Sequence, residues 1–195
     1  ASTAAAAYII GELKRDIKIP FGVDMLWDPM ATIALGTATK ANFVREIFTG
    51  TYSSDMGIWA PNAGEALRYK QNLGSEEMLL LFNISAEFAY SQDRRPLTDR
   101  ARSVVFSSLP DAILVSGQIT GEAASMNDLM SVKKALPLTP VLANTGVKHD
   151  TVIQVLKNAD GCIVGSSLKE DGNTWKPVDP KRARDFMNIV SKFRK

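Results

Sequence analysis

Two short loops near the end of the chain carry the residues best suited to hold an anion. The first follows an apolar run in PVLANTGVKHD, residues 140–150, and the second follows the run GCIVG in GCIVGSSLKED, residues 161–171. Backbone N–H groups bind a phosphate best where little side chain covers them. Two such strand–loop units in succession are typical of the phosphate site after the seventh and eighth strands of a β/α barrel. The predicted phosphate-binding residues are Asn144, Thr145, Gly146, Gly165, Ser166, Ser167 and Lys169.

Polar side chains at the ends of two other predicted strands are the candidates for proton transfer. Asp24 follows the run IPFGV, and Asn83 and Glu87 lie at the end of the run EMLLLFNI and just beyond it. A carboxylate in a semi-enclosed mouth can have its pKa shifted toward neutrality, which suits a general base. Asp24, Glu87 and Asn83 are therefore the predicted catalytic residues. The alternatives are that Asp24 only holds neighbouring loops, that Glu87 is a solvated carboxylate, and that Lys169 is merely exposed.

Four further features are considered, and three of them have two interpretations each. Arg45 and Glu46 are adjacent in a predicted strand, so they face opposite sides, and either an internal ion pair or a catalytic carboxylate explains them. His149, the only histidine, either caps a helix or touches the phosphate. Residues 49–57, TGTYSSDMG, are expected to close over the pocket as a lid. The three tryptophans adjoin loops and either pack against the barrel rim or stack on a ligand ring.

Apolar runs suited to buried parallel strands alternate along the chain with segments of helical spacing. The strands are predicted at residues 19–26, 42–48, 77–84, 111–117, 139–145 and 161–166. The helices between and after them are predicted at residues 28–40, 62–74, 97–109, 126–137, 149–158 and 180–193. Asp179 is a plausible N-cap for the last helix, with Pro180 at its first position. No linker divides the chain, which predicts a single β/α domain over residues 1–195.

This count gives six β/α units, preceded by a helix without its own strand, whereas a closed barrel needs eight. One explanation is an α/β barrel of the TIM type, (β/α)8, of which strands one and two are missing here. The other is an open doubly wound sheet, but that fold places its glycine-rich turn after the first strand, and IPFGVDMLWDP has none. We therefore favour the partial barrel. Its third and eighth strands would have exposed edges, so we expect either a homo-oligomer that pairs these edges or a longer protein whose first segment is absent here.

Composition excludes several other classes. The 195 residues are 45% hydrophobic, with a net charge of only +2, so no basic stripe is available for nucleic acid. Every hydrophobic run is too short for a membrane span, although peripheral association stays open. The single Cys162 lies in an apolar strand and indicates an inert thiol in a reducing compartment, here taken as the cytoplasm. No cluster of Cys, His and carboxylates has zinc-site spacing, so no metal is predicted and no cofactor is assigned.

The order of several segments resembles the BtpA/SgcQ family of TIM-barrel proteins. The segments are IPFGVDML, FVREIFTGTYSSDMGIWAPNAGEALRYKQNLG, AILVSGQITGE, PVLANTGV and DGCIVGSSLKEDGNTWKPVDPKRARDFM, which cover most of the chain from Pro20 onward. The family's N-terminal region, with the first barrel strands, has no counterpart in them. Family members often have a Lys-His pair just past the fifth barrel strand, where this chain has Glu87 and Phe88. That departure argues against chemistry that depends on the pair.

The resemblance implies two functional classes. The cyanobacterial namesake of the family is associated with photosystem I biogenesis and behaves as an extrinsic membrane-associated protein. Bacterial relatives are encoded among sugar-metabolism genes and are candidate enzymes. The first class is an enzyme for a phosphorylated small molecule, such as a sugar phosphate or a nucleotide. The second is a non-catalytic assembly factor that keeps a ligand site. The fold does not choose between them, but convergent carboxylates would favour the enzyme and a large exposed apolar patch the assembly factor.

Overall fold

A computed structural model describes residues 1–194 as an α/β structure built around one parallel sheet. The sheet strands are β1 (Gly22–Val23), β2 (Phe43–Glu46), β5 (Leu79–Asn83), β7 (Ala112–Val115), β8 (Val141–Ala143) and β9 (Gly161–Cys162). The α-helices are α1 (Ser2–Leu13), α2 (Pro29–Thr39), α3 (Ala63–Asn72), α4 (Leu97–Ser108), α5 (Met126–Ala135), α6 (Val152–Asn158) and α7 (Pro180–Phe193). Short 3-10 turns are η1 (Lys14–Asp16), η2 (Ser166–Leu168) and η3 (Glu170–Gly172).

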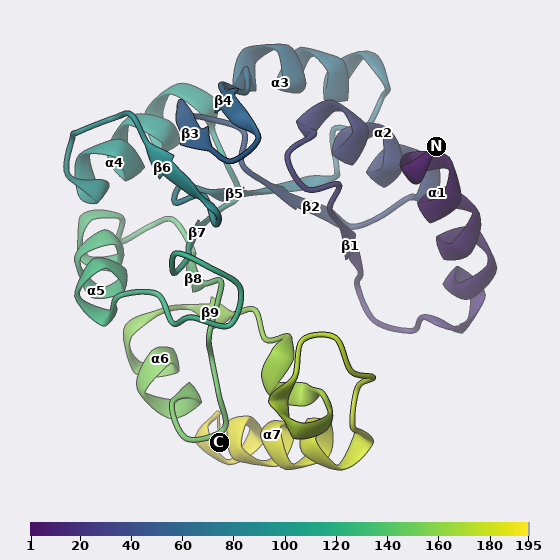
Figure 1. Cartoon of the computed structure of the whole chain (residues 1–195). Coiled ribbons are helices and arrows are strands. Elements are labelled where there is room, and N and C mark those ends of the chain that lie inside the picture. Colours follow the sequence, from purple (N-terminus) through teal and green to yellow (C-terminus); the bar gives the residue numbers. More distant parts are fainter. Residues whose placement is uncertain (195) are drawn as a thin grey trace.

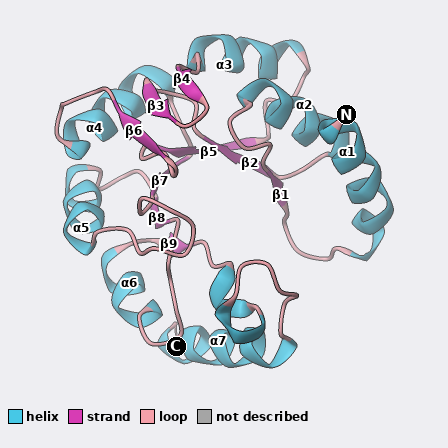
Figure 2. Cartoon of the chain, viewed as in Figure 1, coloured by secondary structure: helices cyan, strands magenta, loops and turns pink. Residues whose placement is uncertain are grey.

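The order of the strands decides between the two predicted folds. Each strand is the neighbour of the next one along the chain, β1-β2-β5-β7-β8-β9, and every pair is parallel. A doubly wound sheet would reverse its order at a switch point, and this sheet does not. The strands form a curled arc with the helices along its outer side (Figures 1 and 2). The barrel prediction is therefore confirmed, as a six-stranded arc with β1 and β9 at its edges.

All six predicted strands and all six predicted helices are present, and the strands are shorter than expected. The predicted cap of α7 is confirmed, because Asp179 Oδ1 accepts hydrogen bonds from the backbone N–H groups of Lys181 and Arg182. Asp28 caps α2 in the same way, through the N–H of Ala31. Within residues 1–194 no helix has the length and apolar character needed to cross a bilayer.

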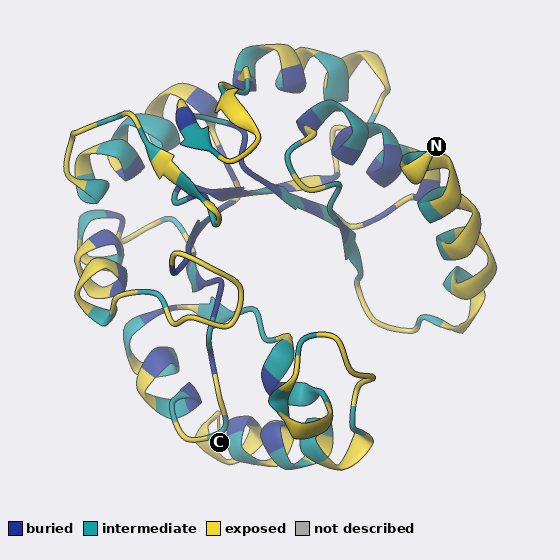
Figure 3. Ribbon diagram, in the orientation of Figure 1, coloured by how far each residue is buried: buried dark blue, intermediate teal, exposed yellow. Residues whose placement is uncertain are grey.

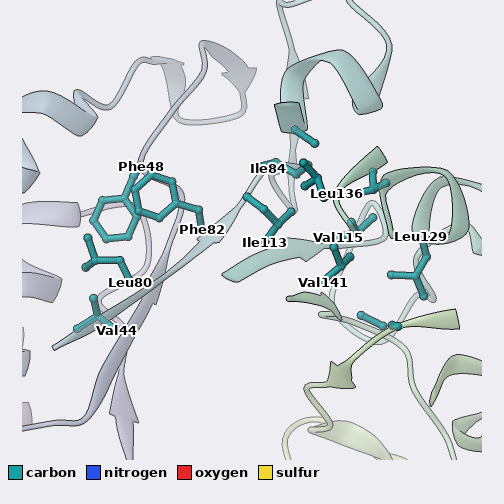
Figure 4. Close-up of a cluster of buried hydrophobic side chains, with 14 of the residues drawn as sticks. Val44, Phe48, Leu80, Phe82, Ile84, Ile113, Val115, Leu129, Leu136 and Val141 are labelled. Atoms are coloured by element: carbon teal, nitrogen blue, oxygen red, sulfur yellow. The ribbon is translucent and has the colours of Figure 1, made fainter. Parts of the chain in front are cut away.

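The core lies between the sheet and the helices. Side chains of period two on each strand, such as Val44, Leu80 and Phe82, are fully buried on the helix side, where the rings of Phe48 and Phe82 stack 4.4 Å apart. Strands β7 and β8 and the helix α5 add further apolar groups to this cluster, among them Ile113, Val141 and Leu129 (Figure 4). Intervening side chains such as Leu81 are only half-buried, because they face the concave side of the arc.

A second sheet lies over the arc, and the sequence did not predict it. It is antiparallel and consists of β3 (Tyr52–Ser54), β4 (Gly57–Trp59) and β6 (Ala89–Ser91), in the order β4-β3-β6. Its inner side packs Tyr52 and Trp59 against Trp27, whose indole ring stacks on that of Trp59 at 5.1 Å. The expectation of a lid over residues 49–57 is wrong, because this segment is a packed hairpin and none of it lines the cavity at the carboxyl ends of the later strands.

The outer side of this second sheet is apolar and exposed, in contrast to the buried faces of the main sheet (Figure 3). Ile58 and Tyr90 lie in one row on either side of Ser53, and their side chains are 80% and 76% exposed. Met56, at the tip of the hairpin, and Phe88, just before β6, are also exposed. We call these four apolar residues the hairpin patch.

Candidate functional site

A large cavity lies at the carboxyl ends of the later strands. It has a volume of about 910 Å³ and is walled by the loops that follow β7, β8 and β9, with the first turn of α7 beside them. This is the end of a parallel β/α sheet where loops from successive strands converge on ligands. Six of the seven predicted phosphate-binding residues line it, namely Asn144, Thr145, Gly146, Gly165, Ser166 and Ser167.

The backbone of the two predicted loops is suited to an anion. Among residues 1–194 no acceptor takes a hydrogen bond from the N–H groups of Gly146, Gly165, Ser166 or Ser167. The last three N–H groups lead into the 3-10 turn η2, whose first donors have no acceptor within the turn. We call these four residues the anion cradle. The N–H groups of the cradle are free to bind an anion in the cavity.

The two glycines of the cradle are there for different reasons. Gly146 has φ +67°, and a Cβ atom at this position would overlap the backbone of Glu122 and Ala123 in the loop after β7. Gly165 has a negative φ, and a Cβ atom there would meet nothing within 4 Å. Gly146 is therefore required by the packing of two loops, whereas Gly165 leaves the cavity open.

Arg182 is a cavity residue that the sequence analysis missed. It stands in the first turn of α7, where its backbone N–H bonds to Asp179, and its Nε donates to the carbonyl of Ser167 at 2.9 Å. No described residue accepts a hydrogen bond or ion pair from its terminal Nη atoms. The guanidinium therefore brings a positive charge to the cradle. The signal in the sequence was the cluster KRAR after PVDP, but a basic first turn of a helix usually lies in solvent.

His149 joins the cradle to the same helix. Its Nε2 lies 2.9 Å from the carbonyl of Arg182, and its Nδ1 lies 3.1 Å from the hydroxyl of Ser167. The ring is half-buried and packs edge-on against Phe186. His149 is thus not a surface cap, and it contacts a residue of the cradle directly.

The cavity also contains a carboxylate in a polar network. Glu87 Oε1 accepts a hydrogen bond from Asn144 Nδ2 at 3.0 Å, and Glu87 Oε2 accepts one from the hydroxyl of Thr120 at 3.2 Å. The hydroxyl of Ser116 donates to Oε1 at 3.4 Å and accepts from the amides of Asn83 and Asn144. Glu87 lines the cavity, whereas Asn83 lies behind it and acts through Ser116.

Asp24 lies outside the cavity and reaches it through Arg45. Arg45 Nη2 donates to Asp24 Oδ2 at 2.7 Å, and Nη1 donates to Asn144 Oδ1 at 2.8 Å. Arg45 and Glu46 do not pair, because consecutive strand residues face opposite sides. Glu46 is buried, with 2% exposure, and has Asp24 as its acidic neighbour. Asp24 Oδ1 and Glu46 Oε2 are both buried and have no hydrogen-bond partner among the described residues. A proton on Glu46 relieves the repulsion between the two carboxyl groups.

Glu46 should make stability depend on pH. Burial, and then the charge of Asp24, raise the pKa of Glu46 from 4.5 to about 9. The folded state therefore keeps a proton that the unfolded chain releases above pH 4.5, and stability falls as the pH rises from 4.5 toward about 9. Glu46→Gln mimics the protonated form, so we expect it to gain about 1 kcal/mol or more over the parent at pH 8 and nothing at pH 4.5. Urea unfolding at several pH values measures this.

Glu77→Gln is the matched control, because Glu77 is an exposed carboxylate. It should leave the pH dependence of the free energy of unfolding unchanged. Equal curves for the parent and for Glu46→Gln would show that Glu46 is ionised in the folded protein.

Besides Asn83, two predicted residues do not line the cavity. Lys169 Nζ donates to the carbonyl of Thr174, and the residue does not line the cavity. Asp24 is separated from the cavity by Arg45. In the described part of the chain no three His, Cys, Asp or Glu side chains are grouped as a metal site. The cavity thus combines an anion cradle and Arg182 with a carboxylate held by hydrogen bonds.

A curled parallel sheet with its main cavity at the carboxyl ends of the strands defines a protein of the β/α-barrel class. Residues 1–192 match the family model of the BtpA family, and the chain belongs to that family. The match includes α1, which precedes the segments that carry the resemblance in the sequence. The sgc region protein SgcQ of Escherichia coli K12 is 45% identical over 194 residues, which are 100% of this chain and 72% of that protein. The photosystem I biogenesis protein BtpA of Synechocystis is 30% identical over 98% of this chain and 67% of that protein.

Solved structures with little sequence similarity share the fold. The native KDPGal structure superposes with a TM-score of 0.58 at 14% identity, over 97% of this chain and 76% of that one. Phosphoribosyl anthranilate isomerase from Thermus thermophilus gives 0.57 at 12% identity, over 85% and 68%. A geranylgeranylglyceryl phosphate synthase from Thermoplasma acidophilum gives 0.51 at 13% identity, over 96% and 86%. These likenesses concern the barrel architecture.

Proposed function

We propose that this protein binds a phosphorylated small molecule in the cavity and acts on it as an enzyme. The observation that carries the proposal is the anion cradle. Its N–H groups, from two adjacent loops, have no acceptor among residues 1–194, and beside them stands the Arg182 guanidinium, whose Nη atoms have no partner in the same range. Backbone donors and an arginine fork are the groups that proteins use to bind phosphate. A cavity of about 910 Å³ has room for a phosphate and an attached sugar-sized body.

Glu87 is the proposed proton-transfer group. It lines the cavity, and its two oxygens are oriented by Asn144, Ser116 and Thr120. A carboxylate held in this way in a partly enclosed site is suited to removing a proton from a hydroxyl or from a carbon beside a carbonyl. Asn83, Asp24 and Arg45 are then positioning residues, because each reaches Glu87 only through Ser116 or Asn144.

The neighbours with the same fold support this choice of ligand. The synthase from Thermoplasma acidophilum was crystallised in complex with sn-glycerol-1-phosphate, and the barrel fold often binds phosphate between its seventh and eighth strand loops. In this chain β8 and β9 take the places of those strands. The proposed substrate class is therefore a phosphate ester of a small polyol, sugar or nucleoside.

A second function is favoured by the hairpin patch. Exposed apolar side chains gathered on one sheet face are typical of a surface that binds another protein, and a relative is named for photosystem I biogenesis. In that role the protein would be a non-catalytic assembly factor. The cavity would then hold a regulatory ligand or none.

A binding experiment with paired variants tests the first function. Inorganic phosphate, glycerol phosphate and sugar phosphates near 100 times their Kd should raise the melting temperature by about 5 to 10 °C. Gly165→Asp puts a negative charge beside the cradle without steric overlap, so we expect its affinity for the best of these compounds to fall at least tenfold. Differential scanning fluorimetry across a concentration series measures both.

Gly165→Asn is the matched control, because it has the same size and no charge. It should bind clearly better than Gly165→Asp, and both should melt near the parent without ligand. If no phosphorylated compound stabilises the parent, the proposed binding is wrong and the assembly function becomes the better account.

A further inference from the structure

A closed ring of three hydrogen bonds connects the cradle to α7. His149 Nε2 lies 2.9 Å from the carbonyl of Arg182, Arg182 Nε donates to the carbonyl of Ser167 at 2.9 Å, and the hydroxyl of Ser167 lies 3.1 Å from His149 Nδ1. The three residues come from the loop after β8, the loop after β9 and the first turn of α7. Two of them, Ser167 and Arg182, are also proposed anion ligands.

The partners of His149 define which nitrogen carries hydrogen. A backbone carbonyl can only accept, so Nε2 must carry a hydrogen whether the ring is neutral or charged. Nδ1 of the neutral ring is an acceptor and takes the hydroxyl hydrogen of Ser167. Nδ1 of the imidazolium is a donor, so the Ser167 oxygen becomes the acceptor and its hydrogen must point elsewhere.

The Ser167 hydroxyl lines the cavity, where a bound anion could accept its hydrogen. Ser167 is 9% exposed and lines the cavity, and in the described part of the chain its hydroxyl has no other partner than His149. An anion in the cradle offers an acceptor at this place. The hydroxyl therefore has two competing acceptors, the neutral imidazole and the anion, and protonation of the imidazole removes the first.

We infer that His149 is a positioning residue that sets the number of hydrogen-bond donors in the cradle: the charged ring frees the Ser167 hydroxyl for the anion and the neutral ring withholds it. This inference rests on the proposed function and deepens it, because it makes the affinity for an anion depend on the state of one imidazole. Affinity should rise as the pH falls through the range in which histidine titrates.

No other charge near the ring changes in that range. Lysines and arginines stay protonated and ordinary carboxylates stay ionised between about pH 5.5 and 8.0. The Lys181 hydrogen bond and, further down the order of causes, the charge of His149 lower the pKa of Asp185, so this carboxylate also stays ionised. The negative charge of Asp185 favours the charged form of the His149 ring, whereas the positive charge of Arg182 disfavours it. The charged groups around the ring are Lys148 and Asp150 on its own loop, Arg182 and Asp185 on α7, and Asp171 on η3.

Sulfate is the suitable probe, because it remains a dianion over this whole range whereas phosphate gains a proton near pH 6. Its Kd should be measured by isothermal titration calorimetry at about pH 5.5, 6.5 and 8.0. We expect the parent to bind about tenfold more weakly at the highest pH than at the lowest. His149→Gln has an amide that can still donate to the carbonyl of Arg182 and cannot titrate, so its Kd should vary less than about twofold.

Ser167→Ala separates the hydroxyl from the charge of the imidazolium. If the hydroxyl is the responding group, this variant binds more weakly at low pH and loses most of the pH dependence. A full pH dependence in Ser167→Ala, or the same dependence in the parent and His149→Gln, would overturn the inference. Sulfate binding that is independent of pH but abolished by Arg182→Gln would overturn it too and leave the proposed function standing. No binding by the parent at any pH, with sulfate or phosphate, would sink both.

Discussion

Arg182→Gln is expected to weaken the binding of inorganic phosphate by about 30- to 100-fold, roughly 2 to 2.7 kcal/mol. The guanidinium lines the cavity next to the cradle, and its terminal Nη atoms have no acceptor among residues 1–194. Its side chain is already oriented by the bond from Nε to Ser167, so little conformational entropy is lost when a phosphate binds. The other basic side chains of the cavity differ, because Arg45 is paired with Asp24 and Lys148 is exposed. Calorimetric titration with phosphate measures the change.

Lys181→Gln is the matched control for this variant. Lys181 is in the same turn of α7, but it is exposed and bonded to Asp185, so its loss should change the affinity less than about twofold. Arg182→Lys keeps the charge without the planar fork and should fall between the parent and Arg182→Gln. If Arg182→Gln binds phosphate within about threefold of the parent while it folds normally, Arg182 is not an anion ligand.

Gly146→Ala is expected to lower the free energy of unfolding by about 2 to 4 kcal/mol, or roughly 5 to 15 °C in melting temperature. Two costs add at this position. The left-handed φ of +67° is strained for any residue with a Cβ atom, and the added methyl group would overlap the backbone at Ala123. Backbone atoms cannot move aside as the end of a flexible side chain does, so the loops after β7 and β8 must separate. Urea or thermal unfolding without ligand measures the loss.

Gly165→Ala is the matched control for Gly146→Ala. Gly165 is the other glycine of the cradle, and its φ is negative with open space around the missing Cβ. We expect the stability of this variant to stay within about 0.5 kcal/mol of the parent. Equal stability of the two alanine variants would show that the loops after β7 and β8 are not packed as closely as described.

The sequence by itself determined most of the architecture. The alternation of apolar runs with segments of helical spacing located all six parallel strands and the helices between them, because these periods are local properties of the chain. The two glycine-containing loops located one wall of the cavity for the same reason, since loops after adjacent parallel strands must meet at one end of the sheet. Motif order was enough to indicate the BtpA family, which the family model confirms.

Only the tertiary structure decided which side chains complete the site. Ser53 pairs with Tyr90 across 37 residues, so the second sheet forms from two segments that look like loops when they are considered separately. Arg182 enters the cavity because α7 packs beside η2, and Lys169 is excluded because the chain turns back on it at Thr174. Glu46 holds a proton because burial and Asp24 act on it together. Each of these depends on the distance between residues remote in the sequence, and local periodicity contains no information about that distance.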